Sequence, residues 1–121
     1  MVEKLGKLEI YKLSLKLSDD IWQVYKRLPK EFRFNIGSQL LNSTDSIGAN
    51  IAEGFGRYHY NDKIKFYYNA RGSLFETKHW ILLLYKREFI DEIKKSELLI
   101  QCENIGKKLN KFITKSRNKN A

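Results

Sequence analysis

The chain has 121 residues, a formal net charge of +9 and a single cysteine. A chain of this length forms one domain that buries roughly 60–70% of its unfolded surface, enough for a hydrophobic core. No apolar run reaches the ~18–20 residues of a transmembrane helix, and the first residues lack the apolar segment of a secretory signal. One cysteine excludes an internal disulfide and fits a reducing compartment, so we expect a cytoplasmic protein.

The positive charge is unevenly distributed along the chain. From Gly106 onward there are six lysines and arginines and no acidic residue. A polyanion, and nucleic acid first of all, is therefore the partner that the charge favours. A surface charged only for solubility is the alternative that remains open at this point.

Periodic apolar residues and the presence of only one proline predict an all-α chain. The first helix covers about 8–28 and ends before Pro29, because the residue before a proline disfavours the helical conformation. Three further helices are expected at about 30–53, 61–86 and 91–115. Short connections join these helices. Together they predict a single domain, residues 1–115, with the fold of an antiparallel up-down four-helix bundle. A basic, disordered tail is expected to follow at 116–121.

The first and third predicted helices carry more apolar surface than one bundle core requires. Two apolar stripes cover a little over half the circumference of the first helix, and the third is apolar on most sides. A helix that lines one core needs only a single, narrower stripe. The second faces therefore predict contact with another partner, and we expect a homo-oligomer.

Small residues cluster in the second half of the second helix. Gly48 costs roughly 0.8–1 kcal/mol relative to alanine inside a helix, so we expect a neighbouring helix to approach it closely. Asn50 and Glu53 share a face and are expected to form hydrogen bonds across to another helix. Gly54 and Gly56 are expected to end the helix in the left-handed conformation.

A possible metal motif lies on the third helix, where Glu76 and His79 are three residues apart. Di-iron bundles need two such pairs and two further carboxylates, and this sequence has only one pair, with Glu53 as a carboxylate from a facing helix. We therefore predict no metal site and no cofactor. Glu53 and Glu76 are instead expected to be structural, accepting hydrogen bonds from Arg71, Ser73 or backbone groups.

No arrangement of residues in the sequence indicates catalysis. Cys102 lies on the apolar face of the fourth helix, where packing in the core is expected rather than nucleophilic chemistry. Gly54 and Gly56 lack the spacing and the preceding strand of a nucleotide-binding fingerprint. We predict that the protein is not an enzyme and has no catalytic residues.

A set of short motifs between residues 28 and 76 resembles a known family. The matching pieces are Leu28-Pro29 with Glu31, Gln39-Leu40, Ser46-Ile47, Asn-Ile-Ala-Glu-Gly-Phe-Gly-Arg at 50–57, Phe66, Ala-Arg-Gly-Ser at 70–73, and Glu76. They resemble the four-helix-bundle proteins encoded in intervening sequences of bacterial 23S rRNA genes. The accessory variability determinants of diversity-generating retroelements are related to these proteins.

The resemblance implies a homopentameric ring of bundles without enzymatic activity and with a nucleic-acid-binding role. In the retroelement relatives, the protein also has a reverse transcriptase as a partner. One departure concerns the second helix, where the family often has basic residues after the Gln-Leu pair. Here Leu41 and Asn42 follow instead, which shifts the expected nucleic-acid contact to the fourth helix.

The predicted nucleic-acid-binding residues lie mainly on one arc of the fourth helix, with no carboxylate among them, so we expect no acid nearby to neutralise their charge. They are Lys107, Lys108, Lys111 and Lys115, helped by Arg57 and Arg71. Contacts to phosphates would bind structured RNA or an RNA–DNA hybrid with little sequence preference. Most aromatic residues have core spacing, so exposed rings for stacking on single strands are not expected.

The sequence leaves two alternatives to nucleic-acid binding. A basic amphipathic helix can lie on a membrane, but the apolar face of this one is needed for the core, so no membrane partner is expected. The other alternative is a purely structural oligomer or a protein–protein adaptor.

Overall fold

A computed structural model describes the backbone of residues 2–120 and the side chains of residues 4–117. All regular structure in this range is helical, which confirms the predicted all-α class. The elements are α1 (Val2–Lys7), α2 (Glu9–Arg27), α3 (Lys30–Phe32), the π-helical turn η1 (Arg33–Gly37), α4 (Ser38–Gly56), α5 (Tyr60–Lys86) and α6 (Glu92–Asn120).

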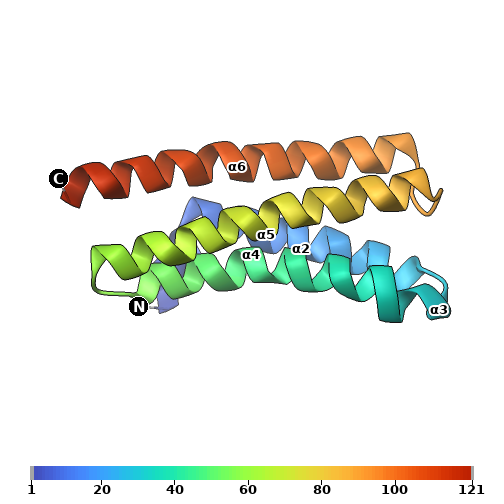
Figure 1. Cartoon of the computed structure of the whole chain (residues 1–121), viewed down its shortest axis with the longest axis horizontal. Helices are drawn as coiled ribbons and strands as arrows, with labels where there is room; N and C mark the ends of the chain where they lie inside the picture. Colours follow the sequence, from blue (N-terminus) through green and yellow to red (C-terminus); the bar gives the residue numbers. More distant parts are fainter. Residues whose placement is uncertain (1, 121) are drawn as a thin grey trace.

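The long helices lie lengthwise beside one another as a helical bundle (Figure 1). α4 packs most extensively against α5, while α2 contacts both α4 and α6, and α5 also contacts α6. The α4–α5 turn, the beginning of α1 and the end of α6 lie at one end of the molecule. We call this the terminal end. The opposite end holds α3 and the turn between α5 and α6.

The core runs through the middle of the four long helices. Its fully buried side chains include Leu17, Ile21, Leu40, Ile47, Ile51, Leu74, Ile81, Leu84, Leu98, Ile105 and Leu109. Two buried hydroxyl groups join α4 to α5, because Thr77 Oγ1 lies 3.0 Å from Ser43 Oγ. Ser43 also donates to the Leu40 carbonyl at 3.0 Å, so these polar atoms are satisfied inside the core.

Two glycines of α4 allow close contact with neighbouring helices. A Cβ on Gly48 would lie 3.0 Å from Ser14 Oγ of α2, and a Cβ on Gly54 would lie 2.5 Å from Tyr67 Cε1 of α5. The first contact shows that a side chain of the neighbouring helix α2 closely approaches Gly48. The second shows that Gly54 provides space for an aromatic ring.

The predicted glycine stop at Gly54 and Gly56 is wrong. Neither glycine has a positive φ, and α4 continues through Gly56 until Arg57 adopts an extended conformation. The helix can continue because nothing in a glycine forces a left-handed turn. Burial of the α4 face against Tyr67 favours the helical conformation instead.

The predicted second helix at 30–53 is divided by η1. Arg33 explains part of this local structure, because its guanidinium caps the end of α2. Arg33 Nε donates to the Leu28 carbonyl at 3.0 Å, and Nη2 donates to the Lys26 carbonyl at 2.6 Å. Such local hydrogen bonds leave no mark on apolar periodicity.

The C-terminal segment also differs from the expectation of a disordered tail at 116–121. The structure continues α6 through Asn120, and residue 121 lies outside the described residues. Arg117 donates a hydrogen bond to the phenol oxygen of Tyr68. This contact ties the last turns of α6 to α5.

Replacing Glu88 with glycine should stabilise the protein. Glu88 has φ = 67°, and its neighbour Phe89 donates to the Leu84 carbonyl at 2.9 Å to close the end of α5. A left-handed non-glycine residue costs roughly 1–2 kcal/mol, which glycine avoids. We expect urea denaturation to show a free energy of unfolding about 1 kcal/mol higher for Glu88→Gly. Arg87→Gly, at a negative φ, is the control and should not be stabilised.

Candidate nucleic-acid interface

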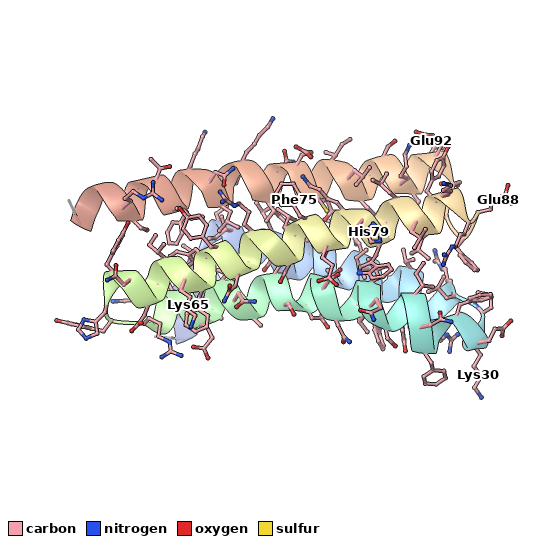
Figure 2. All side chains as sticks on the ribbon, in the orientation of Figure 1. Lys30, Lys65, Phe75, His79, Glu88 and Glu92 are labelled. Carbon is pink, nitrogen blue, oxygen red and sulfur yellow. The ribbon has the colours of Figure 1, made fainter. Side chains whose placement is uncertain are left out.

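The net charge of the described side chains lies entirely in one half of the bundle. The half at the terminal end, formed by residues 4–17, 47–70 and 105–117, has twelve basic and three acidic residues. The other half, formed by 18–46 and 71–104, has ten of each. Both signs occur together at the opposite end, where Figure 2 labels Lys30, Glu88 and Glu92. The bundle therefore has one positive half and one neutral half.

Three of the four predicted α6 lysines line a shallow pocket of about 240 Å³ beside the start of α2. The lining residues are Leu8, Glu9, Ile10, Lys108, Lys111, Phe112 and Lys115. Glu9 Oε1 lies 3.1 Å from Lys108 Nζ, so a carboxylate from α2 partly neutralises the stripe. The expectation that no acid lies nearby is wrong for this lysine, because helix packing brings Glu9 to α6.

Lys107 faces a different neighbourhood from the other three lysines. It is exposed and contributes to the positive charge around Glu103. The pKa of the Glu103 carboxyl group is lowered chiefly by its hydrogen bond with Lys78 and then by the nearby positive charges. The predicted single arc of lysines therefore divides into a pocket of three and a separate Lys107.

The two predicted arginines lie over aromatic rings of α5. The Arg57 guanidinium is 4.8 Å from the ring centre of Phe66 and forms a 3.0 Å ion pair with Glu53. The Arg71 guanidinium is 4.8 Å from the ring centre of Tyr68. Both guanidinium groups are therefore within cation–π distance of an aromatic ring.

Arg71 also connects α5 to the basic part of α6. Its Nη1 donates to Asn110 Oδ1 at 3.2 Å, and Asn110 lies one residue before Lys111. The structure thus places Arg71 near the α6 lysines, at the border of the positive half. Arg57 belongs to the α4–α5 turn at the terminal end.

Two of the predicted structural polar residues bond within their own helix. Asn50 Nδ2 donates to the Ser46 carbonyl at 2.8 Å, and Glu53 accepts from Arg57. Both bonds differ from the predicted contacts across to a facing helix. Both side chains lie at the margin of α4, Asn50 half-buried and Glu53 exposed, where partners one turn away are closer than those on another helix.

The other predicted polar residues lie on α5. Glu76 Oε1 accepts from Trp80 Nε1 at 3.3 Å, rather than from Arg71 or Ser73 as expected. The Ser73 carbonyl accepts from Thr77 at 2.9 Å. His79 is exposed and its ring centre is 4.7 Å from that of Trp80, and Figure 2 shows it on the same helix as Phe75.

A second pocket lies at the terminal end and was not predicted from the sequence. We call it the aromatic pocket. It measures about 410 Å³ and is lined by Phe55, Tyr58, Tyr60, Lys63, Tyr67, Phe112 and Ser116. Tyr58 is 91% exposed, so the expectation that no exposed ring is available for stacking is wrong. The available signal was the Tyr-His-Tyr run at 58–60, which lies in a connection without a core face to explain it.

Comparison with known proteins places the chain in a family. The family model described as "23S rRNA-intervening sequence protein" matches residues 6–111. This chain belongs to that family. No curated protein matches the chain.

A solved structure supports the assignment of this chain to the 23S rRNA-intervening sequence protein family. The fold is similar to the crystal structure of a protein with unknown function from the S23 ribosomal protein family of Bacteroides thetaiotaomicron VPI-5482. The two sequences are 30% identical, and the alignment covers 86% of this chain and 97% of that chain, with a TM-score of 0.81. The shared fold therefore includes nearly the whole bundle.

In this member of the family, the described residues contain no group of three or more His, Cys, Asp or Glu side chains that could hold a metal ion. Cys102 is fully buried, as its position on the apolar face predicted, and burial raises the pKa of its thiol to about 12. The thiol is therefore protonated at neutral pH. Within the part of the chain described, none of the helices has the length and apolar character needed to cross a bilayer.

Proposed function

We propose that this protein is a non-enzymatic nucleic-acid-binding protein that contacts phosphates through its positive half. The observation that carries the proposal is the separation of charge, with the whole excess at the terminal end and equal numbers of acids and bases elsewhere. Charge that serves solubility alone does not need to gather at one end. The family description, which refers to 23S rRNA, supports structured RNA as the ligand, while an RNA–DNA hybrid is the ligand that the resemblance to the retroelement proteins implies.

The α6 pocket offers a specific place for phosphate oxygens. Lys111 and Lys115 are exposed beside Lys108. Neither Lys111 nor Lys115 takes part in any of the described ion pairs. The pair between Lys108 and Glu9 is itself exposed. Because such surface pairs contribute little and are screened by salt, a phosphate can replace the Glu9 carboxylate at Lys108.

Titration of a labelled RNA duplex and an RNA–DNA hybrid with the protein tests this proposal. Contacts to phosphates release counterions, so we expect the logarithm of the binding constant to fall steeply and linearly with the logarithm of salt concentration. Different sequences should bind alike. Absence of binding at low salt would reject the proposal and favour a purely structural oligomer or adaptor.

We further propose that this up-down four-helix unit forms a homo-oligomeric ring, with a pentamer implied by the family resemblance. The helices α2 and α5, for which second apolar faces are predicted, both keep exposed apolar side chains: Trp22 at 45% and Leu15 on α2, and Phe75 at 61% and Leu82 on α5. Ile93 and Ile100 on α6 are exposed as well. Burial of these side chains against another copy would be favourable. A ring would also repeat the positive end several times and strengthen its field.

Light scattering is expected to give a mass several times that of one chain at micromolar concentration. Trp22→Glu should lower this mass while leaving the helical circular dichroism unchanged, because Trp22 lies outside the core. A well-behaved monomer for the parent protein would contradict the proposed ring.

A reverse transcriptase is proposed as a further protein partner on the basis of the resemblance to accessory variability determinants. The gene neighbourhood distinguishes the two settings. A reverse transcriptase gene with a template repeat would support this partner, whereas a large-subunit ribosomal RNA gene around the coding sequence would support the intervening-sequence setting.

A further inference from the structure

We propose that the aromatic pocket binds an unstacked nucleotide of the nucleic acid held by the positive half. This inference rests on the proposed nucleic-acid binding, and it adds a ligand class that phosphate contacts alone do not specify. The ligand is an unpaired base, such as one in a loop, bulge or overhang.

The floor of the aromatic pocket is formed in advance by packed rings. Tyr67 is 1% exposed, and its ring centre lies 4.9 Å from that of Phe112 at an interplanar angle of 67°. Gly54 allows this position, since a Cβ there would lie 2.5 Å from Tyr67 Cε1. The floor therefore needs little rearrangement to receive a ligand.

The rim of the aromatic pocket contains an aromatic ring, that of Tyr58, which the described residues leave exposed. Tyr58 is 91% exposed, and its edge-to-face contact with His59, at 5.3 Å between ring centres, leaves most of its surface accessible. Tyrosine rings offer flat apolar faces with a polar tip. Unstacked bases are commonly held on such faces in proteins that recognise single-stranded RNA.

The electrostatic surroundings favour an anionic ligand at the aromatic pocket. The last carbonyls of α4 would otherwise present negative partial charge to a phosphate. Lys63 Nζ lies 3.2 Å from the Phe55 carbonyl and 3.4 Å from the Gly54 carbonyl, and donates to them. Lys63 is thus the cationic residue that lines the pocket. Arg57 and Arg117 are the sequence neighbours of the lining residues Tyr58 and Ser116 and are exposed in the same positive half.

The volume of the aromatic pocket and the positive charge around it both favour a nucleotide as the ligand. A pocket of about 410 Å³ lies within the ~300–1,000 Å³ range of small-ligand sites. A second copy of this chain is the main competitor for an exposed ring. Docking the same positive end of another copy would place like charges together, whereas a nucleotide brings the opposite charge. An unstacked nucleotide is therefore favoured.

Two matched RNA probes isolate the contribution of the pocket. One is a blunt duplex, and the other is the same duplex with a short single-stranded 3′ overhang. We expect the parent protein to bind the overhang probe more tightly. Tyr58→Leu should weaken binding of that probe by roughly 5- to 150-fold, the range of one lost base–aromatic stack, while binding of the blunt duplex stays the same.

Phe34→Leu is the control, because Phe34 is 76% exposed but belongs to η1 in the neutral half. It should leave the binding of both probes unchanged. Failure of both probes to bind the parent would reject the proposed function itself. Equal binding of the two probes, or an unaffected Tyr58→Leu variant, would overturn only the nucleotide pocket. A changed oligomeric mass for Tyr58→Leu would also overturn it, by showing that another copy covers Tyr58.

Discussion

Glutamine at four α6 positions should weaken the binding of every nucleic acid and make binding less sensitive to salt. The changed residues are Lys107, Lys108, Lys111 and Lys115. Each lost phosphate contact lowers the slope of the logarithmic salt plot by about 1. We expect the slope to become shallower by about 3 to 4, since Lys108 shares its charge with Glu9 and contributes less than the others.

The matched control removes four exposed charges from the neutral half. It replaces Lys26, Lys30, Lys86 and Arg87 with glutamine, and all four are exposed. Either set of changes lowers the formal charge from +9 by the same amount. If the control weakens binding as much as the α6 variant does, net charge and not its position explains the affinity. Light scattering checks that both variants keep the oligomeric mass of the parent.

Replacing Gly54 with alanine should destabilise the protein. The added Cβ would lie 2.5 Å from Cε1 and 2.8 Å from Cδ1 of Tyr67, and that ring is buried against Phe112. The ring cannot move without disturbing the packing of α4, α5 and α6. Overpacking of this kind costs roughly 1–3 kcal/mol, which urea denaturation followed by circular dichroism measures as a lower free energy of unfolding.

Gly56→Ala is the control, and its free energy of unfolding is not expected to fall. Gly56 is also in α4, but a Cβ there would meet nothing within 4 Å. Alanine is favoured over glycine in helices by up to about 1 kcal/mol, so this variant should be as stable as the parent or more stable. Equal destabilisation of both variants would show that glycine conformation, and not contact with Tyr67, explains Gly54.

The long helices follow from the pattern of apolar residues in the sequence. Periodic apolar residues predict helices because each helical turn returns a side chain to the same face. On α6 this spacing correctly predicted that Cys102 is buried. Pro29 correctly predicted the end of α2, since Leu28 adopts an extended conformation before it. The resemblance to the 23S rRNA-intervening sequence proteins also comes from the sequence, and the family model that matches residues 6–111 confirms this family.

Local structure that depends on single hydrogen bonds was not predictable in the same way. The π-helical turn η1 and the continuation of α6 beyond residue 115 involve local contacts of this kind, such as the hydrogen bonds of Arg33 and Arg117, which the apolar pattern does not encode. Gly54 looked like a helix stop because glycine is common there. Its actual role depends on Tyr67, a residue of another helix.

The tertiary structure alone decided which distant residues meet and where the charge gathers. Glu9 reaches Lys108, and Tyr58 and Phe112 line one pocket, although nothing in the sequence pairs these positions. Periodicity identifies the face of one helix. The alignment of that helix along its neighbours follows from the packing of all their side chains together. For this reason the helices could be predicted from the chain, whereas the positive half and its aromatic pocket appear only in the folded bundle.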